Sequence, residues 1–122
     1  MTSSSRDLPA SELLVTLEWR DKAAVLRVEG EIDLLSAPEF EDVVTGVVAD
    51  RPELLVVDLR SVTFLCSAGL QVLAGAHRSL STSDIRVVSD STVTTRPFTS
   101  TGLDTWIGVF PTLEQALASP AT

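Results

Sequence analysis

The sequence contains only one cysteine and one histidine, and none of its apolar runs is long. The single cysteine, Cys66, has no second cysteine with which to form an internal disulfide, which favours a reducing compartment. One cysteine and one histidine are also too few for a recognisable zinc site. The short apolar runs exclude a transmembrane helix, and the polar N-terminus lacks the apolar core of a signal peptide. We therefore expect a cytoplasmic protein without a bound metal or cofactor.

Basic residues are scarce as well. Nine lysines and arginines stand against seventeen aspartates and glutamates, which gives a net charge of −8. Nucleic acids and anionic membranes attract basic surfaces, so neither is expected as a partner. Thirteen of the acids lie in residues 1–61. This asymmetry fits an acidic face for a basic protein partner, and it fits ordinary solubilising charge equally well.

The chain of 122 residues is long enough for one domain and too short for two full-sized cores. We expect this domain at residues 12–118. A disordered N-terminal tail is expected at residues 1–11, where the sequence is polar and rich in serine, and a short C-terminal tail at residues 119–122.

Strand and helix patterns alternate along the domain. Apolar and polar residues alternate at 13–19 and 23–29, which predicts an opening β-hairpin whose second strand ends at Gly30. The apolar run at 54–59 predicts a central strand that is covered by other elements. Further strands are expected at 85–89 and 106–110, and helices at 36–51, 67–80, 91–97 and 112–118. This order predicts an α/β fold, a mixed central sheet of about five strands with helices packed on it.

Local signals add detail to these elements. The four-residue segments that begin at Ser36 and Thr112 have the S/T-x-x-E/Q pattern of a helix capping box. Trp19 and Trp106 alternate with polar residues within their strands, so we expect both to pack in the core or at its edge. Pro97 is expected to close the third helix.

Ser67 follows the central strand and begins the second predicted helix. Backbone amides at a helix N-terminus are unpaired and the helix dipole is positive there, so a hydroxyl at this point could carry a phosphate. The helical period places Ser67 on a solvent-facing stripe with Gln71, Ala74, Gly75 and Arg78. These residues alone fit a simple helix cap at Ser67 better than a modification site.

Three other side chains could carry chemistry. Asp58 ends an apolar strand, as the phosphoacceptor of a receiver domain does, but the chain lacks the paired acids and the late lysine of a receiver, so we predict a structural role. Cys66 and His77 could be a nucleophile and its base, but no third group orients them and there is no G-x-S-x-G motif. Cys66 is also a candidate redox site, because a thiol at a helix N-terminus oxidises readily; a small buried side chain is the simpler interpretation.

Three segments together resemble a known family. The first is Gly30-Glu31-Ile32-Asp33-Leu34 with Ser36-Ala37-Pro38. The second is the strand at 54–59 followed by Phe64-Leu65-Cys66-Ser67-Ala68-Gly69-Leu70. The third is Thr101-Gly102-Leu103-Asp104 followed by Thr112-Leu113-Glu114-Gln115-Ala116-Leu117. In this order and at these separations they resemble the STAS-domain anti-sigma factor antagonists, over about residues 12–118.

The resemblance implies a STAS fold and a switch in place of an enzyme. Unphosphorylated antagonists of this family bind an anti-sigma factor, a serine kinase of the histidine-kinase-like ATPase fold, and the sigma factor is released. The kinase phosphorylates a serine of the antagonist, which ends the interaction, and a metal-dependent serine phosphatase restores it. The acceptor is the first serine of the family's DSSG segment, which corresponds to Ser67.

The resemblance also implies a partner surface around this serine. Its expected members are Asp33, Ser36, Cys66, Ala68, Gly69, Gln71 and Gly75. Asp33 fits a solvated turn acid equally well. Two positions depart from the family: Ala68 replaces a second serine, which leaves Ser67 as the acceptor, and Cys66 replaces an aspartate that caps a helix better. The alternative function is a non-switching STAS interaction module of a stress-signalling assembly, redox-sensitive through Cys66.

Overall fold

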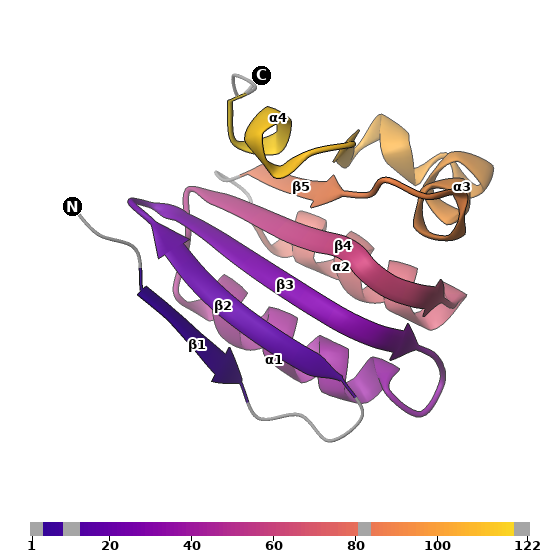
Figure 1. The fold of residues 1–122 in the computed structure, drawn as a ribbon, viewed down its shortest axis with the longest axis horizontal. Helices are drawn as coiled ribbons and strands as arrows, with labels where there is room; N and C mark the ends of the chain where they lie inside the picture. Colours follow the sequence, from indigo (N-terminus) through magenta and orange to yellow (C-terminus); the bar gives the residue numbers. More distant parts are fainter. Residues whose placement is uncertain (1–3, 9–12, 81–83, 119–122) are drawn as a thin grey trace.

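The computed structural model describes residues 4–8, 13–80 and 84–118 of the chain (Figure 1). Its strands form one sheet in the order β1-β2-β3-β4-β5-β6. The strands are β1 Ser4–Leu8, β2 Leu14–Arg20, β3 Ala23–Ile32, β4 Leu54–Leu65, β5 Asp84–Val88 and β6 Gly108–Phe110. The helices are α1 Ala37–Ala49, α2 Ser67–Ser79, α3 Thr92–Thr101, the 3-10 turn η1 Leu103–Thr105 and α4 Leu113–Ala118. The α/β fold with a mixed sheet is confirmed.

The sheet combines an antiparallel and a parallel half. β1 pairs with β2 and β2 with β3 in antiparallel fashion, whereas β3, β4, β5 and β6 run parallel to one another. The opening hairpin is therefore confirmed as β2 and β3. Because β3, β4 and β5 are parallel, the segments that follow them all leave the sheet at the same edge, and this edge positions the candidate site.

The two faces of the sheet are covered differently. Helices α1, α2 and α3 cover one face over a large apolar cluster that includes Phe40, Leu73 and Phe98, and Figure 1 shows α1 and α2 behind the strands. Helix α4 covers part of the other face over a smaller cluster with Val56 and Ala116. Residues 55–59 are buried throughout, which confirms the prediction of a covered central strand.

Residues 4–8 differ from the expected disordered tail, because they form β1 and give the sheet six strands where about five were predicted. The sequence does not signal this strand because it lacks apolar alternation. Its pairing with β2, in which Leu8 lies opposite Val15, satisfies the backbone groups of β2 that would otherwise form an open edge. Residues 1–3 and 9–11 of the predicted N-terminal tail, and the whole predicted C-terminal tail at 119–122, lie outside the described residues.

Glycine and proline act differently from the prediction at two places. Gly30 does not end β3; with φ of 118° it coincides with a shift in the register between β3 and β4, and the strand continues to Ile32. Pro97 lies inside α3, which continues to Gly102, a left-handed residue with φ of 75°. Proline lacks the amide that would bond to the carbonyl of Val93, and its ring crowds that carbonyl. The helix continues nonetheless, because its buried residues Thr94 and Phe98 hold it against the core.

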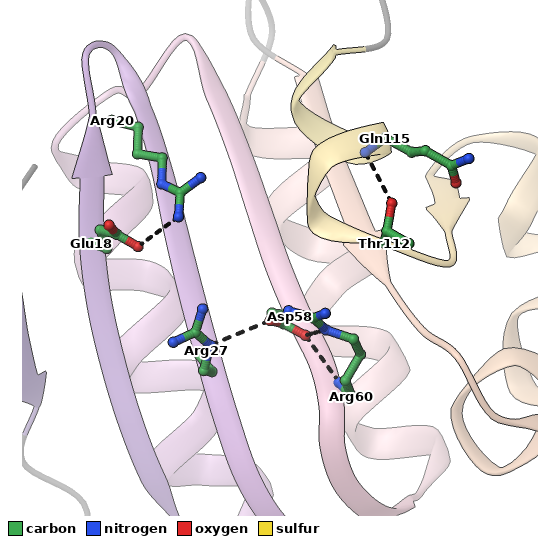
Figure 2. Close-up of polar contacts among 7 residues, drawn as sticks. All are labelled: Glu18, Arg20, Arg27, Asp58, Arg60, Thr112 and Gln115. Carbon is green, nitrogen blue, oxygen red and sulfur yellow. Dashed lines mark hydrogen bonds and ion pairs between the residues drawn. The ribbon is translucent and has the colours of Figure 1, made fainter.

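The two tryptophans occupy different environments, and the capping box at Thr112 is present. Trp19 packs against the core as expected, but the expectation for Trp106 is wrong, because this residue follows η1 and is 67% exposed. The Thr112 box begins α4 as predicted: the backbone amide of Gln115 donates to Thr112 Oγ1 at 3.1 Å (Figure 2).

Candidate functional site

The candidate site lies where β4 ends and α2 begins. Cys66 is extended there, and its backbone amide donates to the carbonyl of Ile32 at 2.9 Å, so the start of α2 is joined to the end of β3. The Cys66 carbonyl accepts hydrogen bonds from the amides of Gly69 and Leu70. The first turn of α2 is thus built by backbone hydrogen bonds, and the Cys66 thiol makes no capping bond.

Ser67 is the first residue of α2 rather than its cap, because the cap position is occupied by Cys66. Its side chain is exposed and has no hydrogen-bond partner among the described residues. A capping serine would hold a backbone amide of the first turn with its oxygen. The simple-cap interpretation of Ser67 is therefore wrong, and its hydroxyl is exposed at the first position of α2.

The expected solvent-facing stripe of α2 is largely present. Ser67, Gln71 and Arg78 are exposed, and Gly75 is half-buried. Gln71 and Gly75, together with Ala68, line an open groove of about 550 Å³ between α1 and α2. These α2 residues therefore share one continuous surface with the beginning of α1.

Asp33 and Ser36 shape the loop between β3 and α1. Asp33 Oδ1 accepts hydrogen bonds from the backbone amides of Leu35 and Ser36, both at 3.0 Å. These hydrogen bonds, first of all that from Ser36, lower the pKa of the Asp33 carboxyl. The Ser36 hydroxyl accepts from the Asp33 amide at 2.9 Å and donates to the carbonyl of Glu31 at 2.7 Å. The loop is held by its own hydrogen bonds.

Ser36 consequently differs from two expectations. Its hydroxyl points back to the loop and makes no capping bond to α1, so the predicted capping box with Glu39 is wrong. It is also only 1% exposed, so it does not itself present a surface to a partner. Its role in the structure is to hold Asp33 and the loop in position.

Gly69 is a packing residue as well. A Cβ atom at this position would lie 2.7 Å from Ile32 Cγ2 and 2.9 Å from Leu65 Cδ1. The absence of a side chain lets the first turn of α2 approach the ends of β3 and β4 closely. At Gly75 the nearest atom to such a Cβ is Arg78 Nη2 at 3.8 Å, so that position is open. Of the two predicted contact glycines, only Gly75 faces the groove.

The residues considered for catalysis or metal binding do not converge. His77 lies about three turns along α2 from Cys66, roughly 16 Å at the helical rise per residue, so the two cannot act as base and nucleophile. The His77 ring instead lies beside that of Trp106, with 6.3 Å between centroids. Within residues 4–8, 13–80 and 84–118, no group of three or more His, Cys, Asp or Glu side chains could hold a metal ion.

Asp58 lies far from this junction in the same strand, on the sheet face opposite α1 and α2. Figure 2 shows it between Arg27 and Arg60, whose guanidinium nitrogens approach Asp58 Oδ2 at 3.4 and 2.8 Å. Burial favours the neutral carboxyl, but the hydrogen bonds from Arg60 outweigh it and lower the pKa of Asp58. This geometry is that of a structural ion cluster.

Comparison with known proteins assigns the chain to a family. The STAS domain family model matches residues 15–116. The anti-sigma-F factor antagonist RsfB of Mycobacterium tuberculosis is 42% identical over 106 residues, which cover 86% of this chain and 87% of that protein. The chain belongs to the STAS-domain family of anti-sigma factor antagonists.

Solved structures agree with this assignment of the STAS domain. The crystal structure of an anti-sigma factor antagonist from Mycobacterium paratuberculosis superposes with a TM-score of 0.81 at 39% identity, covering 93% of this chain and 92% of that one. The Bacillus cell fate determinant SpoIIAA in its phosphorylated form, 20% identical, shares the fold with a TM-score of 0.65 over 84% of this chain and 96% of its own.

Sequence reasoning missed several exposed apolar residues around the start of α2 in this STAS domain. Leu34 and Leu35 are 77% and 80% exposed in the loop that contains Asp33, and Phe64 is 49% exposed three residues before Ser67. The sequence does contain one sign of this surface, because two adjacent leucines stand in an otherwise polar loop. Exposed apolar side chains gathered at one place are typical of an interaction surface.

No helix among the described residues is long and apolar enough to cross a membrane.

Proposed function

We propose that this antagonist binds an anti-sigma factor of the histidine-kinase-like ATPase fold, causes release of the sigma factor, and loses the partner when Ser67 is phosphorylated. The observation that carries the proposal is the exposed Ser67 hydroxyl, free of hydrogen-bond partners among the described residues, at the first position of α2. Two relatives support it: RsfB is an anti-sigma-F factor antagonist, and SpoIIAA has been solved in a phosphorylated form. A metal-dependent serine phosphatase would reset the switch in the cytoplasm.

A phosphate at this position acts on binding more than on folding. A phosphoserine adds about −1.5 to −2 charge at neutral pH, and the unpaired amides and dipole of a helix N-terminus tolerate it. In an interface the same charge must lose its water and meet groups arranged for a neutral hydroxyl. We expect the affinity to fall at least about a hundredfold, which corresponds to roughly 2.7 kcal/mol.

The partner would cover the surface that surrounds the hydroxyl. Its exposed or half-buried members are Asp33, Cys66, Ala68, Gln71 and Gly75. Ser36 and Gly69 support this surface from beneath, because both are buried. The protein then needs no catalytic group or cofactor of its own, and the reaction at Ser67 is performed by the kinase.

Phosphate mapping tests the switch directly. The protein is incubated with ATP, Mg²⁺ and purified anti-sigma factors of the ATPase class, beginning with the anti-sigma-F factor of Mycobacterium tuberculosis, and the phosphorylated residue is located by mass spectrometry. Wild type and Thr63→Ala should be phosphorylated at Ser67, and Ser67→Ala should bind without modification. Ser67→Glu should bind at least tenfold more weakly than Ser67→Ala. Phosphate on Ser61 or Thr63 would contradict the assignment.

A second candidate is a non-switching interaction module that responds to oxidation. It is favoured by the half-buried Cys66 thiol, which stands at the cap of α2 without making a capping bond. In that case peroxide should alter binding of the wild type and leave Cys66→Ser unchanged, while ATP has no effect on either. Phosphorylation of Ser67 with loss of binding would exclude this candidate.

A further inference from the structure

Most exposed apolar side chains of this domain gather at one edge of the sheet. In the described part of the chain, Leu34, Leu35, Phe64 and Val93 are each between 47% and 80% exposed. They follow β3, end β4 and begin α3, and thus lie at the edge where the parallel strands end. The other two large exposed apolar residues are Leu14, at the beginning of β2, and Trp106, which precedes β6 at the opposite edge. This distribution marks the edge that carries Ser67.

Two of these residues belong to a distinct hollow on the α3 side. Phe64 and Val93 line an open surface depression (the cavity) of about 470 Å³ between the end of β4 and α3; its other lining residues are Leu65, Thr92, Arg96, Pro97 and Ser100. Arg96 is the charged residue of this lining, and its side chain is exposed. The depression is therefore more apolar than polar and carries one positive charge, in a chain whose net charge is −8.

Ser67 lies between this cavity and the exposed leucines. Phe64 precedes it by three residues, and the bond from the Cys66 amide to the Ile32 carbonyl brings the loop with Leu34 and Leu35 to the same junction. A stable protein interface covers about 800 Å² on each partner. A protein that takes Ser67 into its active site must therefore cover the neighbouring apolar residues as well.

We infer that the cavity formed by Phe64, Val93 and Arg96 is a second docking subsite for the anti-sigma factor that phosphorylates Ser67. It would receive an apolar side chain of that protein with an acidic residue beside it. Apolar anchors in small pockets supply most of the energy of many interfaces, and a rim arginine selects an opposite charge. The inference rests on the proposed function and extends the surface from α2 to α3.

The subsite and the phosphate should act independently. Phe64 and Val93 contact the partner through apolar surface, and this contact does not require the hydroxyl of Ser67. Their loss should weaken binding of Ser67→Ala and of Ser67→Glu by the same factor, because the energies of contacts made by residues that do not touch the same groups usually add.

Paired serine variants test the subsite. The double variant Phe64→Ser/Val93→Ser should bind the anti-sigma-F factor of Mycobacterium tuberculosis, or the member of the ATPase-class panel that binds wild type best, at least tenfold more weakly. Trp106→Ser is the matched control, since it removes a larger exposed apolar side chain at the other edge, and it should change binding less than twofold. Arg96→Glu should weaken binding three- to tenfold, and less so at high salt. Thermal unfolding of every variant verifies that the domain is folded.

The outcomes separate the subsite from the switch. If wild type binds and is phosphorylated on Ser67 while the double variant binds equally well, the subsite is wrong and the proposed function stands. If the double variant and Trp106→Ser lose affinity equally, the effect is not specific to the cavity and the inference is also wrong. If wild type binds none of the kinases, the proposed function itself fails.

Discussion

Strand β4 passes through two regions that are held together by different forces. In its middle, the buried Asp58 carboxylate is held by the guanidinium groups of Arg27 and Arg60. At its end, the segment 65–70 contains no charged residue, and close packing and backbone hydrogen bonds join α2 to the sheet. The negative charge of Asp58 in the middle of β4 is already paired with arginines, whereas a phosphate on Ser67 would introduce the first charge into the neutral segment that follows the strand. The comparison shows how one strand can stabilise the fold in its middle and lead to the proposed phosphorylation site at its end.

The largest effect is expected in the charged region. Asp58→Asn removes the charge that both arginines share, and should lower the free energy of unfolding by about 1.5–3 kcal/mol at neutral pH. The arginine side chains are 42% and 35% exposed and can be solvated, which keeps the loss below that of a fully buried pair. Chemical denaturation measures it, with Asp42→Asn, at an exposed position of α1, as the control.

The pH dependence of Asp58→Asn tests whether the middle of β4 is stabilised by charge. Asp58 has a lowered pKa in the folded protein, so its contribution is present above the ordinary aspartate pKa and is lost as the pH falls through the folded value. The stability difference between wild type and Asp58→Asn should therefore shrink below about pH 4. A difference that stays constant from pH 7 to pH 3 would contradict the ion cluster.

A smaller effect is expected from packing in the neutral region. In Gly69→Ala the added methyl group meets Ile32 and Leu65 at less than 3 Å, and the resulting overpacking should cost about 1–2 kcal/mol. Gly75→Ala is the matched control in the same helix, and should stabilise the domain by about 0.5–1 kcal/mol because its Cβ meets open space. Thermal unfolding should move in opposite directions for the two. Equal shifts would show that α2 is not held by this contact.

The smallest effect is expected from a charge placed at the cap of α2. Cys66→Asp should add a capping hydrogen bond of about 0.5–2 kcal/mol and raise the midpoint of thermal unfolding by a few degrees. Phosphorylation of Ser67 should become faster if the carboxylate orients its hydroxyl. Cys66→Ser is the control, because it offers a cap without charge. No change in stability or rate would show that the thiol is a neutral replacement.

The fold could be predicted well wherever an apolar pattern is compatible with only one kind of secondary structure. The apolar alternation around Leu17 and Leu26 specifies a hairpin, and the apolar run that includes Val57 specifies a covered strand, because burial requires these patterns in any tertiary context. Pro97 misled because proline is costly inside a helix, and the local sequence does not show that packing of the helix outweighs this cost. The burial of Phe98, which holds α3 against the core, is a property of the assembled domain.

The candidate site was predictable in its centre and less so at its margins. The helical period placed Ser67 and Gln71 on an exposed stripe, and the structure agrees. Ser36 and Gly69 were expected at the surface, but the folded chain buries both. Residues contributed by separate elements, such as Phe64 and Val93, share no sequence period, so only their packing across the cavity identifies them as neighbours.

The sequence by itself determined the order of the elements, the solvent-facing stripe of α2 and the resemblance of three segments to anti-sigma factor antagonists, because these depend on short-range periodicity and spacing. The tertiary structure decided which residues lie around Ser67. The parallel pairing of β3 with β4 brings the Leu34 loop to the Cys66 junction, and the docking of α3 forms the cavity beside Phe64. Contacts between residues far apart in the chain exist only after the sheet has formed, since no local pattern encodes them.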